Sequence, residues 1–369
     1  FINSEKDQAN VYAQAYLAKS KDKNDNLNKI KGYRMVGVSL GNNKGLKFLD
    51  SALVLAKENF LHSWYEGFIS YDKGTILYNK RKFKKAIDNF ILANKEARRF
   101  NFSDLLYDSN YMIAILTDRI GNHYDAIKIH QEFLNNNRGH KIGKKDSIRY
   151  LRTLFGLAVA QYKLHNYDSS RYYNDNGLES SLLSNNKEYY NYFTLSTAIN
   201  YYQDGDYSYA LDYIDKSIKY FDSINNLPNL AVCFFYKGKI YIETDRTLVG
   251  LDYLKRVDTI FQYQKDILPE MRESYQILID HYKSSGKSDQ ELTYTKKLLQ
   301  VDSVLNSNYK YLQTNIIKDY YTPILLDKEI QSTSKNFKLI VYSVSSLVIL
   351  LIVAFIHQKK KNLKYQIKF

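Results

Sequence analysis

Residues 74–93 read GTILYNKRKFKKAIDNFILA, and this stretch decides the expected fold. Small or large apolar residues stand at offsets 0, 3, 9, 12, 16 and 19, namely Gly74, Leu77, Phe83, Ala86, Phe90 and Ala93. Side chains three or four positions apart share one face of a helix, so the spacing predicts two helices joined by a polar turn. The small residues at offsets 0 and 12 would let the two helices approach closely, while the large ones fill the seam between them.

The same spacing recurs along the chain. The second clear copy has Gly205 in its turn and consists of Ala198, Tyr201, Tyr207, Ala210, Ile214 and Ser217. Weaker copies begin at residues 37, 114, 158, 238 and 279, so successive copies lie 37 to 44 residues apart. Pro228 and Pro269 fall where one unit ends and the next begins, and proline is favoured at the start of a helix. We therefore expect an all-α fold, an α-solenoid of about seven helical hairpins in which neighbours bury each other's apolar faces.

The composition agrees with a mainly helical chain. The 369 residues include only 3 Pro and 15 Gly, which argues against a turn-rich β protein. The single cysteine, Cys233, excludes an intramolecular disulfide and a zinc site built from cysteines. The formal net charge is 53 − 39 = +14, but outside the lysine-rich last thirteen residues the basic residues are interleaved with acids. This pattern indicates a solvated surface and not a phosphate-binding stripe.

Catalytic and metal-binding motifs are missing from the sequence. The seven histidines form neither an i, i+4 pair nor an HExxH motif, and the glycine-rich phosphate and dinucleotide loops and the GxSxG elbow are absent. Asp204 and Asp206 flank Gly205, where carboxylates satisfy the backbone donors of a turn. Cys233 precedes two phenylalanines, which predicts a buried, inert thiol. The sequence therefore predicts no enzymatic activity, no metal and no cofactor.

Residues 339–356 form the most apolar segment. They carry no charge, and thirteen of the eighteen are Leu, Ile, Val or Phe. A helix of this length spans about 27 Å, close to the thickness of a bilayer core. The sequence predicts a transmembrane helix over 337–357, followed by a basic cytoplasmic tail at 358–369. The predicted location is the inner membrane, with a single span, an extracytoplasmic (periplasmic) array and a cytoplasmic C-terminus, which would require a signal peptide upstream.

The repeat spacing resembles the tetratricopeptide repeat (TPR) over about residues 31 to 300. The resemblance implies a superhelix whose concave face is lined by the first helix of each pair. With the predicted span, we expect the chain to divide into an N-terminal helical cap at 1–30, a TPR array at 31–318 and a juxtamembrane segment at 319–336.

The stretch DYYTPILLDKEI at residues 319–330, together with the array and the predicted span, resembles a group of Bacteroidota membrane regulators. In those proteins a TPR sensor is joined through one span to a helix-turn-helix DNA-binding domain, often of the AraC type. The sequence stops at Phe369 without a recognition helix. DNA binding would therefore belong to a domain absent from this sequence or to a partner.

The predicted binding surface is the concave face. Tyrosines with polar tips, mixed with Arg and Lys, suit an extended peptide or a small ligand, although any one of these tyrosines could instead pack between neighbouring units. The predicted ligand-binding residues are Tyr71, Tyr78, Asn79, Tyr111, Arg119, Arg152, Tyr162, Tyr192, Tyr202 and Lys239.

The leading functional hypothesis is a membrane-anchored sensor that binds a peptide or protein outside the cytoplasm and is coupled to transcription. One alternative is a membrane-tethered scaffold that assembles partners without signalling, and another is the sensor part of a histidine kinase. The sequence identifies neither the ligand, nor the regulated genes, nor the oligomeric state.

Overall fold

The computed structural model describes residues 2–58, 63–136 and 144–366, and all the regular structure within these ranges is helical. The chain divides into two compact units, Phe1–Ile316 and Ile317–Phe369.

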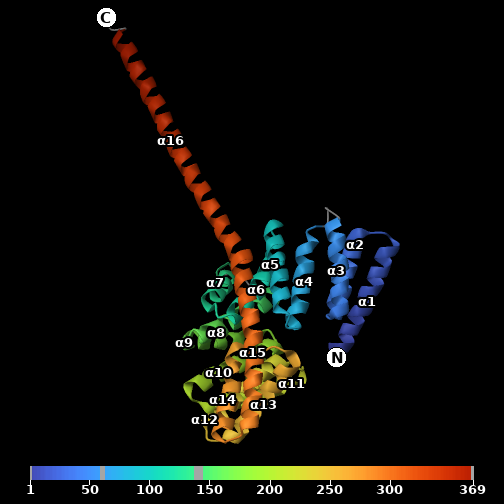
Figure 1. Ribbon diagram of the computed structural model, residues 1–369. Coiled ribbons are helices and arrows are strands. Elements are labelled where there is room, and N and C mark those ends of the chain that lie inside the picture. The colour runs from blue at the N-terminus through green and yellow to red at the C-terminus, as the bar shows by residue number, and fades with distance from the viewer. Residues whose placement is uncertain (1, 59–62, 137–143, 367–369) are drawn as a thin grey trace. The chain divides into compact units, whose positions relative to one another are not determined.

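The first unit begins with α1 (Ile2–Asp22) and continues, in its described part, as seven helical hairpins (Figure 1). The pairs are α2 (Asn26–Leu40) with α3 (Asn43–Glu58), α4 (Tyr65–Asn79) with α5 (Phe83–Arg99), α6 (Ser103–Arg119) with α7 (His123–Asn136), α8 (Lys144–Lys163) with α9 (Tyr167–Leu183), α10 (Lys187–Asp204) with α11 (Tyr207–Ser223), α12 (Leu227–Glu243) with α13 (Thr247–Gln264), and α14 (Glu273–Ser284) with α15 (Ser288–Asn315). A short 3-10 helix, η2 (Pro269–Arg272), precedes α14. Every predicted copy begins inside the first helix of a pair, so the expected solenoid of helical repeats is confirmed.

Small residues allow the two helices of a hairpin to pack closely. A Cβ atom on Gly74 would lie 2.6 Å from the Phe90 ring, so the seam between α4 and α5 has no room for a side chain there. In the pair α12–α13, a Cβ on Gly250 would lie 2.5 Å from the carbonyl oxygen of Gly238. The offset-12 residue Ala210 is 0% exposed, as the spacing predicts.

Left-handed residues end many of the helices. Gly205 has φ +81°, but residues other than glycine also occupy this region, namely Asn24, Arg81, Asn101, His165, Asn185, Asn225, Asp245 and Lys265. In the turn after α4 the amide of Arg81 donates to the carbonyl oxygen of Tyr78 at 2.9 Å. A left-handed non-glycine residue costs about 1–2 kcal/mol, so packing of the hairpins must offset the conformational cost of these turns.

A continuous apolar core runs between the hairpins from α10 to α15. Phe221, Leu254 and Tyr275 are 0% exposed within it. A large apolar side chain contributes about 1.5–3 kcal/mol to the free energy of folding when it is fully buried. Cys233 belongs to the same core, and burial raises the pKa of its thiol. The predicted burial of this cysteine is therefore confirmed, and its inertness stays a prediction.

The second unit consists mainly of the long helix α16 (Thr322–Gln366), coloured red in Figure 1, which follows the π-helical segment η3 (Ile316–Tyr321). Across the part of the chain that the structure describes, no helix is both long and apolar enough to span a membrane. This finding overturns the predicted single-pass location in the inner membrane, with its periplasmic array and cytoplasmic C-terminus. The prediction rested on the uncharged run at 339–356, which lies within α16. In the predicted tail at 358–369, helix α16 continues to Gln366, and most of the side chains lie outside the described part.

Candidate functional site

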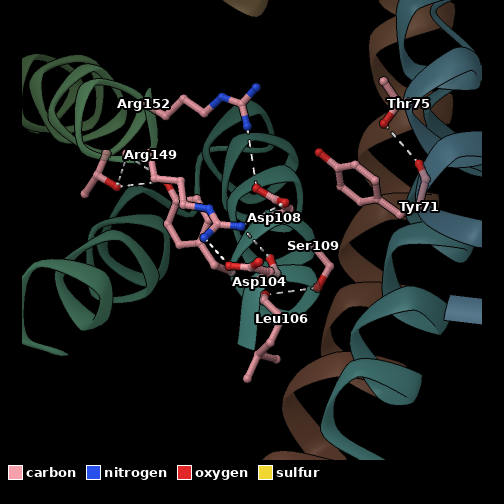
Figure 2. Close-up of polar contacts among 10 residues, drawn as sticks. Tyr71, Thr75, Asp104, Leu106, Asp108, Ser109, Arg149 and Arg152 are labelled. Atoms are coloured by element: carbon pink, nitrogen blue, oxygen red, sulfur yellow. Dashed lines mark hydrogen bonds and ion pairs between the residues drawn. The ribbon is translucent and has the colours of Figure 1, made fainter. Parts of the chain in front are cut away.

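Four first helices contribute side chains to one polar and aromatic cluster. The Arg152 cluster, as we name it, consists of Tyr71 on α4, Asp108 and Tyr111 on α6, Arg152 on α8 and Tyr189 on α10. Figure 2 shows Tyr71 pointing toward Asp108, which Arg152 approaches from α8. Arg152 Nη1 lies 3.6 Å from Asp108 Oδ1, and the Arg152 guanidinium carbon lies 5.4 Å from the centre of the Tyr111 ring.

The Arg152 cluster keeps a positive charge among neutral hydroxyl groups. Burial alone would lower the pKa of Arg152, but Tyr189, Tyr111 and Tyr71 together hold it above its ordinary value. Burial, helped by the Asp108 carboxylate, raises the pKa of Tyr71 to about 12. Burial likewise raises the pKa values of Tyr111 and Tyr189. At neutral pH the three phenols are therefore protonated, and the Arg152 side chain, 32% exposed, is accessible to a ligand.

Arg149 supports the cluster from within the array. Its side chain is 7% exposed, forms an ion pair with Asp104, and places Nη2 3.3 Å from Asp108 Oδ2. The hydroxyl of Tyr107 donates to the Arg149 carbonyl oxygen at 2.7 Å. The Asp108 carboxylate is thus shared between two arginines. Because Arg149 holds one of its oxygens, the Asp108 side chain has fewer orientations in which it can contact Arg152.

A second group, the Tyr202 cluster, lies on α8, α10 and α12 and consists of Tyr162, Tyr202, Tyr236, Lys239 and Glu243. The Tyr202 hydroxyl donates to Glu243 Oε1 at 2.6 Å, and its ring lies 5.3 Å from that of Tyr236 in an edge-on arrangement. The Lys239 Nζ atom lies 5.5 Å from the centre of the Tyr202 ring. Burial raises the pKa of Tyr236, which also interacts with the Tyr162 hydroxyl.

The structure brings together six of the ten predicted binding residues. Three of them, Tyr71, Tyr111 and Arg152, lie in the Arg152 cluster, and Tyr162, Tyr202 and Lys239 lie in the Tyr202 cluster. Each of the six side chains is buried or half-buried, so none is fully accessible to solvent. Their role in binding stays a prediction.

The other four predicted residues lie outside the two clusters. Tyr192 donates to Glu188 at 2.8 Å and packs with its ring 5.4 Å from that of Phe155. Tyr78 packs edge-on against Phe83 in its own hairpin. Asn79 is exposed at the end of α4, and Arg119 is engaged by Asp266 far along the chain.

The sequence-based reasoning missed Asp108, Tyr189, Tyr236 and Glu243. A signal for Asp108 was present, because it stands three residues before Tyr111 and therefore shares its helix face. Tyr236 stands three residues before Lys239 in the same way. Within the described ranges, no group of three or more His, Cys, Asp and Glu side chains is arranged to hold a metal ion.

Comparison with known proteins identifies the fold. No family model matches the chain. No curated protein matches it either. Among solved structures, the apo form of RapI is 15% identical, with a TM-score of 0.50 over 89% of this chain and 95% of RapI.

Two further solved structures are similar. A Rap protein complexed with Competence and Sporulation Factor is 13% identical, with a TM-score of 0.50 over 82% of this chain and 95% of the Rap chain. BtubC (BKLC) from P. vanneervenii is 16% identical, with a TM-score of 0.41 over 60% of this chain and 92% of BtubC. The two Rap structures support a TPR-like helical repeat fold, whereas the resemblance to Bacteroidota regulators gains no support from these comparisons.

Proposed function

We propose that the array is a binding module, not an enzyme, and that it takes a peptide or a protein segment along the face formed by its first helices. The Arg152 cluster is the observation that carries this proposal. It offers a charged, partly exposed guanidinium surrounded by three protonated tyrosines from three different hairpins. Arginine and tyrosine are among the residues that contribute most to binding at interfaces, because they combine apolar contact with hydrogen bonding.

The arrangement of the cluster suits an extended chain. Residues at matching positions of stacked hairpins repeat along the array, so a ligand that lies across α4 and α8 meets the half-buried Tyr71 and Arg152, while Tyr111 and Tyr189 are buried. The similar Rap structure contains a bound partner, Competence and Sporulation Factor, on a fold of the same kind. The Tyr202 cluster extends the same face to α12.

Selection of ligands from a random peptide display library tests the proposal. The full 369-residue chain serves as bait, and calorimetry then measures the dissociation constant of a selected peptide for matched variants. Arg152→Met and Tyr71→Ala should each weaken binding by roughly thirtyfold, since loss of a true anchor costs about 2 kcal/mol. Tyr172→Ala removes a 62% exposed tyrosine from α9, a second helix, and should leave the affinity unchanged.

Three outcomes would contradict the proposal. The library could yield no specific peptide, the two cluster variants could bind like the original chain, or Tyr172→Ala could weaken binding as strongly as they do. Circular dichroism of each variant would show that lost binding does not reflect lost helix.

The sensor, scaffold and kinase-sensor hypotheses all require a partner on the array, and coupling to transcription stays a prediction of the regulator resemblance. A sensor must change conformation when it binds, whereas a scaffold need not. Amide hydrogen exchange in α13–α15, with and without the selected peptide, separates the two, because these helices contribute no residue to the Arg152 cluster or to the Tyr202 cluster.

A further inference from the structure

Two distant parts of the array meet at Asp266, in the segment after α13. Its side chain is 7% exposed and is engaged by Arg119 at the end of α6. Arg119 also donates to the carbonyl oxygen of Ile267 at 2.7 Å. Arg81, in the turn between α4 and α5, places its Nε atom 3.8 Å from the other Asp266 oxygen. One buried carboxylate therefore joins the second, third and sixth hairpins, and Arg119 and Asp266 are 147 residues apart.

A second set of contacts also joins distant hairpins. The last helix of the array, α15, packs against α5, where Asp88 accepts a hydrogen bond from the Tyr311 hydroxyl at 2.8 Å and from Asn315 Nδ2 at 3.0 Å. Lys84 donates to Ser307 Oγ at 2.6 Å. Stacking of neighbouring repeats alone does not require such contacts, because each repeat of a solenoid touches only the next one. The array is therefore also held together across its length.

The Asp266 contact is costly to keep closed. Arg81 occupies the left-handed region at φ +58°, and its buried Nε atom has no hydrogen-bond partner. Burial raises the pKa of Asp266 even though Arg119 and Arg81 act in the opposite sense. Desolvation of buried ion pairs often cancels most of their attraction, so such pairs stabilise a protein weakly while they fix its geometry.

We propose that Asp266, Arg119 and Arg81 form a clasp whose closure sets the spacing of the first helices and is coupled to ligand binding. The helix α6 provides the link, because it carries Asp108 and Tyr111 of the Arg152 cluster and ends at Arg119. A ligand that moves α6 relative to α8 also moves Arg119 relative to Asp266. The coupling to a ligand rests on the proposed function, whereas the existence of the clasp does not.

A distance measurement in the full-length, unliganded chain tests the clasp. Spin labels at Lys82→Cys and Lys265→Cys report on its two sides, since both positions are exposed and each adjoins a clasp residue. The native Cys233 is 0% exposed and stays unlabelled under native conditions. In this background, Asp266→Asn and Arg119→Gln should each lengthen or broaden the distance distribution. The control, Asp245→Asn, changes an exposed aspartate in the turn after α12 and should leave the distribution as it was.

The clasp is refuted if either variant keeps its helix content and gives the original distance distribution. Arg119→Gln leaves Asp266 in place, so it decides the matter if Asp266→Asn does not fold.

The coupling is tested with a peptide selected on the original chain. Asp266→Asn should change its dissociation constant by about fivefold or more, the lower end of typical allosteric coupling, while Asp245→Asn does not. An unchanged affinity overturns the coupling. A peptide that binds the original chain but is insensitive to Arg152→Met contradicts the proposed binding face and leaves the distance result standing.

Discussion

The array should lose stability as the pH falls from about 6.5 to about 4, because α7 buries a neutral histidine. His130 is 3% exposed, and the α8 backbone comes so close that a Cβ on Gly156 would lie 2.3 Å from its Nε2 atom. The Tyr111 ring lies 5.8 Å away. Burial lowers the pKa of His130 from 6.5 to about 4, although the nearby Asp118 carboxylate acts in the opposite direction.

The sign and size of the effect follow from proton linkage. Between these two pH values the unfolded chain binds a proton at His130 that the folded chain does not, so acid favours unfolding. The difference of 6.5 − 4 = 2.5 pH units corresponds to about 3 kcal/mol at about 1.4 kcal/mol per unit. The loss is absent above pH 6.5 and complete below pH 4. Total stabilities of about 5–15 kcal/mol are usual for a domain, so the effect is large enough to measure.

Urea unfolding of the original chain and of His130→Leu at about pH 7.5 and about pH 4.5 isolates this contribution. Carboxylates titrate in both proteins, so only the difference between them reports on the histidine. His130→Leu should lose roughly 2 to 3 kcal/mol less on acidification than the original chain. His165→Asn, at an exposed left-handed position, should behave like the original. Equal pH dependence of the original and His130→Leu would refute the reasoning.

Two further predictions concern the repeats themselves. Ala210→Leu should lower the melting temperature distinctly more than Lys219→Leu, because Ala210 is 0% exposed and overpacking such a site costs about 1–3 kcal/mol, whereas Lys219 is exposed; equal shifts in thermal scans would mean that the assigned seam is wrong. Asp245→Gly should raise the free energy of unfolding in urea by about 0.5–1 kcal/mol, because Asp245 has φ +59°, a left-handed conformation that is strained by a Cβ atom and that glycine adopts freely. A loss of stability instead would show that the Asp245 side chain contributes more than its backbone conformation costs.

The hairpins could be predicted from the sequence because their packing is local. Gly74 and Phe90 are sixteen positions apart, and the same pair of roles returns as Ala198 and Ile214 in the second clear copy, so periodicity places both helices. The same periodicity explains why some of the residues predicted for the concave binding face lie close together. Tyr71, Tyr111 and Arg152 converge because they hold related positions on stacked first helices.

What the sequence could not provide is the pairing of distant residues. Arg119 was predicted to face a ligand, yet it engages Asp266, and no period connects residues in the third and sixth hairpins. The turn conformations were equally hidden, because Arg81 and Lys265 occupy left-handed positions that glycine adopts more readily. The inner-membrane location was inferred from composition alone, and the structure overturned it.

The clasp also has a consequence for how the chain can evolve. Solenoids commonly gain or lose whole repeats, since each new unit needs only a compatible neighbour. Here two hairpins, α8–α9 and α10–α11, separate the hairpin that ends its first helix at Arg119 from the one that precedes Asp266. Loss or duplication of either would still let the remaining hairpins stack on one another, but it would displace Asp266 from both arginines. The Asp266 contact therefore forms only when two hairpins lie between its partners, so natural selection can act on the number of repeats in this array.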